Sequence, residues 1–191
     1  MTKTSIFIRN LILAALLVAV NLLLPQAFHV FGPQAGRLFL PMHLGVLIAG
    51  LFLGPVYGMA VGAASPVLSF LTTGMPQFPT VLFMTGELLT YGLISGLMVK
   101  ALHKLPGKLL RLYVSLIAAM VAGRAVSVIL TVAFGSLLGM KAAMTAPLAV
   151  IASLATGIPG AVLQLAVVPV LVVALEKLSA FAQRRIYVGE E

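Results

Sequence analysis

The sequence contains no cysteine and no tryptophan, and only four of its 191 residues are acidic. Without cysteine the chain has no disulfide framework and no thiolate chemistry. Charged residues are also missing from two long runs, residues 38–86 and 142–175. Because about 20 mainly apolar residues cross a membrane, these runs have room for three or more spans, and no soluble domain this small could bury them. The sequence is therefore that of an integral membrane protein.

The remaining composition agrees with a membrane protein. Hydrophobic residues make up 61% of the chain, charged residues 8%, and the mean hydropathy is +1.17. The net charge of +8 could suggest a nucleic-acid-binding protein, but membrane proteins commonly carry excess Lys and Arg at the cytoplasmic surface. We therefore expect no nucleic-acid partner, and we expect residues 1–191 to form one integral membrane domain in the lipid bilayer.

Helix breakers divide the chain into the six spans of an expected all-α bundle. The Gly54-Pro55 pair separates two short spans, because proline lacks an amide donor and disfavours helical geometry in the residue before it. An N-terminal signal peptide is the alternative to a first span, but no clear small-x-small cleavage pattern follows it. The expected spans are residues 6–28, 42–53, 56–71, 80–101, 111–138 and 158–178, with a short outer segment at 142–156.

Basic residues are divided unequally between the two sides of these spans. One side collects nine Lys and Arg residues, whereas the other has only Arg37 and Lys141. Because cytoplasmic loops carry the excess of Lys and Arg, the first side is predicted to be cytoplasmic. Both termini and the loop 101–110 then lie inside, and the loop 29–41 lies outside.

Four polar residues from four spans are predicted to share one depth in the outer half of the membrane. Glu87 is seven residues into its span, about 10 Å at a rise of 1.5 Å per residue, and Arg124 falls at a similar level. A charge inside the membrane costs roughly 2.5 to 3.5 kcal/mol and should face the protein interior or a wet cavity. This pair indicates a ligand site, a proton relay, or an ion pair between two helices. Asn21 and Gln164 indicate either ligand contacts or interhelical hydrogen bonds.

Three further side chains are candidates for the same site. Tyr91 and Ser127 follow the two charged residues by about one turn and fall on the same helix faces. His43 lies at the outer mouth of the second span, where it either contacts substrate or lies at the membrane interface. The three histidines are scattered and the chain has no Asp and no Cys, so we expect no metal site.

Small residues recur at a spacing of four in two places. Gly50, Gly54, Gly58 and Gly62 predict close packing within a helical hairpin. In the first span Ala15 and Ala19 form a similar pair. That face either packs internally or docks a partner protein.

Two segments of the chain resemble the substrate-binding S component of energy-coupling factor (ECF) transporters. They are RLFLPMHLGVLIAGLFLGPVYGMAVGAASPVLSFLTTGMP and GELLTYGLISGLMVKAL, and the resemblance extends over roughly residues 6–178. It implies a prokaryotic plasma-membrane protein that binds a water-soluble vitamin with high affinity in its outer half. Loops after the first, third and fifth spans enclose the site in that family, which adds Arg37 to the candidates. The substrate-binding candidates are Asn21, Arg37, His43, Glu87, Tyr91, Arg124, Ser127 and Gln164.

The same resemblance implies partner proteins and no catalysis. S components present an Ala-x-x-x-Ala face of the first span to a transmembrane T component, and Ala15 and Ala19 match that face. Two ATPase subunits energise transport, whereas this chain has no GxxxxGK[ST] phosphate loop and could not hydrolyse ATP. We therefore expect neither an enzyme nor a resident cofactor.

The substrate is inferred from what the sequence shares with branches of the family. The N-terminus MTKTS lacks the histidine of nickel and cobalt binders, and the missing tryptophan disfavours thiamin. The segments MHLGV, TTGMP and ELLTYGL resemble the group that includes pantothenate and cobalamin binders. An intramembrane arginine favours an anionic ligand, so pantothenate, which has a carboxylate, is the preferred substrate.

Several alternatives to pantothenate remain open at this point. Other vitamins of the family are cobalamin, folate, niacin, pyridoxine and hydroxymethylpyrimidine. A stand-alone secondary carrier could use Glu87 as a proton site, although the chain shows no convincing internal repeat. An intramembrane hydrolase would need a nucleophile and a base, but the chain has neither Asp nor a GxSxG turn.

Overall fold

The computed structural model describes residues 3–29, 32, 38–140, 146 and 155–188, with the backbone alone after residue 180. Within these ranges all regular structure is helical. The helices in chain order are α1 (Lys3–His29), α3 (Pro41–Ile48), η1 (Ala49–Leu53), α4 (Pro55–Thr73), α5 (Thr80–Ala101), η2 (Leu102–Lys104), α6 (Lys108–Phe134) and α9 (Ile158–Val188). The predicted fold class, an all-α protein, is therefore confirmed for the described residues.

Five helices are long and apolar enough to cross a membrane: Lys3–Phe28, Pro55–Thr73, Thr80–Lys104, Lys108–Phe134 and Ile158–Ala180. The second expected span, by contrast, is the shorter apolar helix Pro41–Leu53. Its last turn, η1, is a π-helix that ends where Gly54 adopts φ 102° and Pro55 starts α4. The predicted break at Gly54-Pro55 is thus confirmed, because only glycine readily adopts that conformation and proline suits a first helical turn.

Two helices end at other residues than the expected spans do. The fifth span was expected to reach residue 138, but α6 ends at Phe134 and a turn follows that contains Gly135 and Gly139, the latter at φ 85°. Two glycines within five residues weaken a helix, and apolar composition alone does not show where it stops. The last helix begins at Ile158 as predicted and continues to Val188, although the part of it that could cross a membrane, Ile158–Ala180, ends close to the expected residue 178. The residues after the expected span end include Ala, Gln and Arg, which are good helix formers in or out of a membrane. The outer segment 142–156 lies almost entirely outside the described residues.

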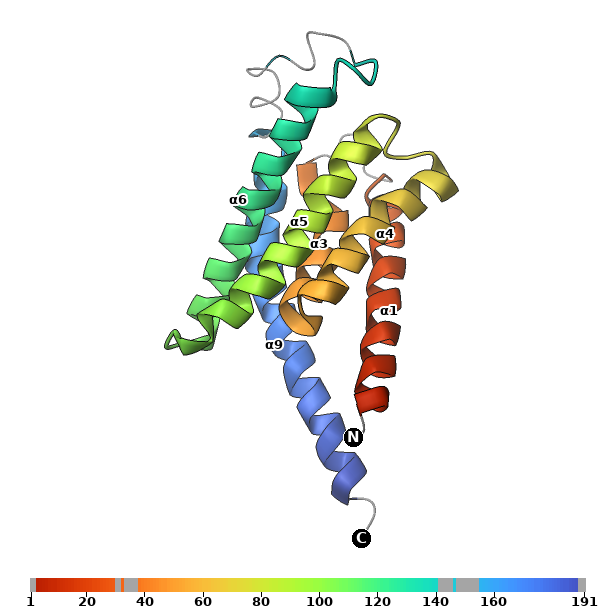
Figure 1. The fold of residues 1–191 in the computed structure, drawn as a ribbon. Coiled ribbons are helices and arrows are strands. Elements are labelled where there is room, and N and C mark those ends of the chain that lie inside the picture. The colour runs from red at the N-terminus through yellow and green to blue at the C-terminus, as the bar shows by residue number, and fades with distance from the viewer. Residues whose placement is uncertain (1–2, 30–31, 33–37, 141–145, 147–154, 189–191) are drawn as a thin grey trace.

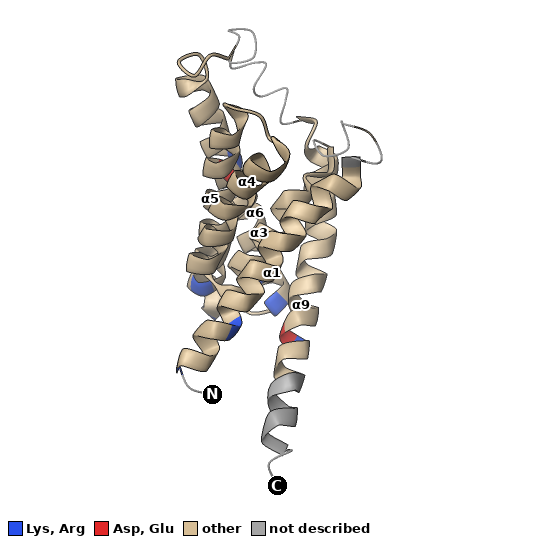
Figure 2. Ribbon diagram, turned by 90° about the vertical axis from the view of Figure 1, so that its right-hand side faces the viewer, with Lys and Arg blue, Asp and Glu red and all other residues tan. Residues whose placement is uncertain are grey.

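The helices are arranged so that α1 begins and α9 ends at the same end of the bundle (Figure 1). The connection between α5 and α6 also lies toward this end, and the α4–α5 turn lies at the opposite end. Figure 2 shows that most described Lys and Arg positions lie toward the end with the termini, while one basic and one acidic position lie together inside the bundle. This distribution agrees with the unequal division of charge in the sequence.

Helices α4 and α5 pack with their backbones unusually close. A Cβ atom on Gly92 of α5 would overlap the backbone of Gly58 in α4, and one on Gly62 would overlap the backbone of Leu88. Small residues permit such an approach between membrane helices. The glycines spaced by four therefore pack on α5 as well as within their own hairpin, where Gly58 also lies against Gly50. This contact holds the segment around Leu88, which includes the polar site described below, in the interior.

The orientation in the membrane can be tested by labelling. Gln77, in the α4–α5 turn, and Lys104, beside the α5–α6 connection, are both exposed at opposite ends of the bundle. Because the chain has no cysteine, Gln77→Cys and Lys104→Cys each introduce one thiol. We expect a membrane-impermeant maleimide to label Gln77→Cys in intact cells and Lys104→Cys only after permeabilisation. The reverse pattern would show that the basic end faces outward.

Candidate functional site

The centre of the site is a buried ionic cluster that joins three helices. Arg124 Nη1 of α6 lies 2.9 Å from Glu87 Oε1 of α5, and His43 Nε2 of α3 lies 3.4 Å from the same oxygen. The side chains of Glu87 and His43 are 6% and 2% exposed, whereas that of Arg124 is 25% exposed. Of the three, the guanidinium is therefore the group that reaches open space.

Tyr91 and Ser127 complete the surroundings of this cluster. The Tyr91 ring packs edge-on against the His43 ring, with a centroid distance of 5.2 Å. Ser127, one turn beyond Arg124, lies close to the Glu87 carboxylate. Both residues therefore lie beside the charged pair, as a spacing of one turn predicts, and their contact with a ligand stays a prediction.

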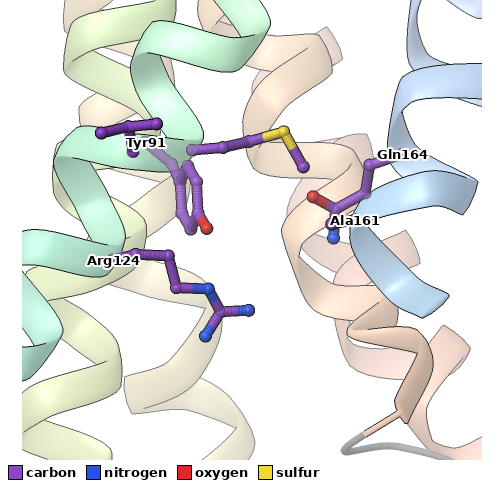
Figure 3. A pocket seen from close by; sticks show the side chains of 6 residues that line it. Tyr91, Arg124, Ala161 and Gln164 are labelled. Atoms are coloured by element: carbon purple, nitrogen blue, oxygen red, sulfur yellow. The ribbon is translucent and has the colours of Figure 1, made fainter. Parts of the chain in front are cut away.

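A cavity of about 290 Å³ opens beside the cluster, between α5, α6 and α9. Arg124, Tyr91 and Gln164 supply its polar groups, and the apolar lining is Met120, Val121 and Ala161. Figure 3 shows Arg124 and Tyr91 pointing into the space that separates α6 from α9, with Gln164 facing them from α9. Apolar walls with a few convergent polar groups are typical of small-molecule sites.

Gln164 also connects the cavity to the start of α3. Its amide Nε2 donates to the Leu40 carbonyl at 3.5 Å, and the same carbonyl accepts the His43 backbone N–H at 3.1 Å. Leu40 has φ 50°, a left-handed conformation that is uncommon for a residue other than glycine. One turn before Gln164, Gly160 lies directly against the backbone of Phe39. The chain before α3 is thus held against the first turns of α9, beside the cavity.

Asn21 lies in a different place from the other candidates. Its Nδ2 donates to Ser65 Oγ at 2.9 Å, and its Oδ1 accepts the Gly45 backbone N–H at 3.1 Å. The side chain is fully buried between α1, α3 and α4 and is not among the residues that line the cavity. These bonds match the interhelical hydrogen bond that the sequence left open for Asn21.

The remaining candidates are Arg37, proposed for the substrate, and Ala15 and Ala19, proposed for a partner protein. Arg37 lies outside the described residues. Ala15 and Ala19 are both exposed on α1, on a helix whose apolar outer face also includes Ile12 and Leu16. These side chains are exposed in the isolated chain, and a face that docks a partner must be exposed before the partner binds.

The sequence missed the apolar residues of the cavity and the role of a backbone group. Met120 and Val121 precede Arg124 by four and three residues, and Ala161 precedes Gln164 by three. The i, i+3 and i, i+4 spacing from the polar candidates could have found all three. No side-chain pattern could have indicated the Leu40 carbonyl.

Comparison with known protein families decides the class of protein. A family model described as "ECF transporter, substrate-specific component" matches residues 9–172. The chain belongs to this family. Neither a comparison with curated proteins nor one with solved structures finds a match.

Membership of the family establishes what kind of molecule carries the cavity. An ECF S component is the substrate-binding subunit of a transporter and not an enzyme, and it works with the T and ATPase components on a small-molecule substrate. The chain is accordingly a multi-pass protein of the prokaryotic plasma membrane. An intramembrane hydrolase and a stand-alone carrier are therefore set aside.

Proposed function

We propose that this S component binds pantothenate, with the ligand's carboxylate on Arg124. The observation that supports this is the position of Arg124, which lines the cavity while its Nη1 pairs with Glu87. A guanidinium carries five N–H donors in a planar fork, so donors remain for a bidentate bond to a carboxylate. Arginine is costly inside a membrane, and an anionic ligand gives a reason for its presence here.

The size of the cavity supports a small ligand. Its volume of about 290 Å³ lies just below the usual range for ligand pockets, ~300–1,000 Å³. A compact vitamin such as pantothenate suits this space better than a corrinoid. Tyr91 and Gln164 face the same space and provide a hydroxyl and an amide for the ligand's own hydroxyl and amide groups.

The ionic cluster gives Glu87 a second role in this proposal. Glu87 holds Arg124 on one side and His43 on the other, and it is not among the lining residues of the cavity. We infer that it fixes the direction of the guanidinium before the ligand arrives, which lowers the entropy lost on binding. Direct contact of Glu87 with a hydroxyl or amide donor of the ligand stays a prediction.

We further propose that the T component docks on the α1 face that contains Ala15 and Ala19. Small residues at this spacing allow two helix backbones to approach closely, and both side chains are exposed. The face belongs to α1, whereas the cavity is formed by α5, α6 and α9. Binding of substrate and docking of the partner would therefore use separate surfaces.

A ligand panel tests the proposed substrate. Purified protein is denatured, and the released small molecules are identified by mass spectrometry. The dissociation constants of pantothenate, niacin, pyridoxine, hydroxymethylpyrimidine, folate and cobalamin are then measured on ligand-free protein. We expect pantothenate to be released and to bind most tightly. Tight binding of a panel member that lacks a carboxylate would contradict the role of Arg124, and niacin as the best ligand would replace pantothenate while preserving that role.

A further inference from the structure

A second hollow lies between α6 and α9, near the end of the bundle that carries the termini. It has a volume of about 430 Å³ and is lined by Leu109 and Tyr113 of α6 and by Pro169, Val170, Val173, Ala174 and Lys177 of α9. We call it the α6–α9 groove. Along α9 the lining runs from Pro169 to Lys177, a rise of about 12 Å at 1.5 Å per residue. Nothing in the proposed binding of a vitamin uses this groove.

The sequence explains why the two helices leave space here. Pro169, at the end of the groove farther from the chain termini, lacks an N–H and interrupts the hydrogen bonding of α9. The residues that follow on this face are small or branched, and in Figure 1 the C-terminal end of α9 extends beyond the other helices. In a membrane such a groove is filled either by lipid or by another protein.

The end of the groove that lies nearer the chain termini is basic. Lys177 lines it, and immediately beside it Lys108 of α6 forms an ion pair with Glu176 of α9. Because Glu176 is engaged with Lys108, the Lys177 ammonium is left for a ligand. Tyr113 lines the facing wall on α6, and tyrosine favours the level of the lipid headgroups. A long apolar floor with a cation at its mouth matches the two parts of an anionic phospholipid.

The groove also lies on the side of α9 away from α1, the helix that carries the face proposed for the T component. Arg9 Nη1 of α1 donates to Ser179 Oγ of α9 at 3.4 Å, so α1 approaches α9 on the side of Ser179. At about 100° per residue, Ser179 lies about 200° around the helix from Lys177. The groove is therefore on nearly the opposite side of α9 from α1. This geometry favours a lipid as its occupant over the partner that α1 docks.

We propose that the α6–α9 groove is a binding site for an anionic phospholipid of the leaflet at the basic end. The headgroup phosphate lies at Lys177, and one acyl chain lies along Tyr113, Val173 and Val170. Basic pockets between membrane helices bind anionic headgroups, and each basic residue near the surface contributes attraction. The site is separate from the vitamin cavity, and its existence does not depend on which vitamin binds there.

Lipid titration of the purified full chain tests the site. Phosphatidylglycerol and phosphatidylcholine with the same acyl chains are added in detergent, and binding is followed by native mass spectrometry. We expect phosphatidylglycerol to bind more tightly. Lys177→Gln should weaken it about fivefold, the factor for about 1 kcal/mol, and leave phosphatidylcholine unchanged. Ala174→Phe should weaken both lipids, because the ring occupies the groove. Lys104→Gln and Ala166→Phe, at exposed positions outside the groove, are the matched controls.

Each other outcome counts against the proposal. Equal affinity of the wild type for the two lipids would show that the groove does not recognise an anionic headgroup. An equal loss in Lys104→Gln would show a general attraction to the basic end rather than a site. If Lys177→Gln and Ala174→Phe bind both lipids normally but no longer assemble with the T component, the groove is a protein-docking surface. Elution as a monodisperse species, checked for every variant, confirms that each protein is folded.

Discussion

Replacing Arg124 with alanine is expected to weaken vitamin binding by a factor of roughly 30 or more. Deleting one partner of a buried charged contact typically costs about 2 to 5 kcal/mol, and 2 kcal/mol corresponds to this factor. Arg124→Lys should recover only part of the affinity, because an ammonium cannot form the bidentate bond of a guanidinium. The measurement is the dissociation constant of the vitamin that the ligand panel identifies. Arg111→Ala is the matched control, since Arg111 lies on α6 but at the far end from the cavity.

A purely structural role for the ion pair makes a different prediction. If Glu87 and Arg124 only join α5 to α6, then Arg124→Ala and Glu87→Gln lower thermal stability, while the affinity of the folded fraction stays unchanged. The double variant Glu87→Gln/Arg124→Ala separates the two roles. It removes the buried carboxylate that has lost its arginine partner, although His43 still lies beside it, and so should regain part of the stability lost by Arg124→Ala. We expect its affinity to remain low. Wild-type affinity in the double variant would show that the substrate does not bind at Arg124.

Placing tryptophan at Ala15 or Ala19 is expected to stop transport without affecting substrate binding. A large ring on this exposed face keeps a second helix from approaching α1. Loss of about 1.4 kcal/mol of association weakens the complex tenfold, so uptake by cells should fall by roughly that factor or more. The dissociation constant of the isolated variants should change by less than about twofold, as for most surface substitutions. Uptake is measured with radiolabelled vitamin at matched expression.

The control for this experiment is an equal substitution elsewhere. Ala133 is exposed on α6, outside the α1 face, so Ala133→Trp adds the same ring to a different surface. We expect normal uptake and normal assembly with the T component. Normal uptake by both Ala15→Trp and Ala19→Trp would reject the docking face, and impaired uptake by Ala133→Trp would show that the ring disturbs insertion rather than docking.

Local signals in the sequence were enough for most of the architecture. Uncharged runs of membrane length predicted helices, and Gly54-Pro55 predicted the boundary between η1 and α4. These features depend on solvent and on backbone geometry, which act on each segment separately. The same local signals did not indicate where α6 ends, because apolar composition continues past Phe134 while the helix does not.

The cost of burying charge allowed part of the site to be predicted as well. Glu87 and Arg124 stood out because an isolated charge inside a membrane is unfavourable, and the structure brings them together. Their one-turn neighbours Tyr91 and Ser127 followed from helical periodicity. A depth estimate, however, places a residue only along the membrane normal. It could not distinguish Gln164, which faces the cavity, from Asn21, which bonds to Ser65 between other helices.

The sequence by itself determined that this is a helical membrane protein with a charged pair inside and a basic end, because solvation penalties act on residues wherever their neighbours lie. Only the tertiary structure decided that His43 shares the Glu87 carboxylate, that Arg124 rather than Glu87 reaches the cavity, and that a groove separates α6 from α9 beside Lys177. These features depend on how helices rotate about their axes and how closely they approach. Those quantities are set by packing contacts between residues far apart in the chain, such as Gly58 and Gly92, which no local pattern encodes.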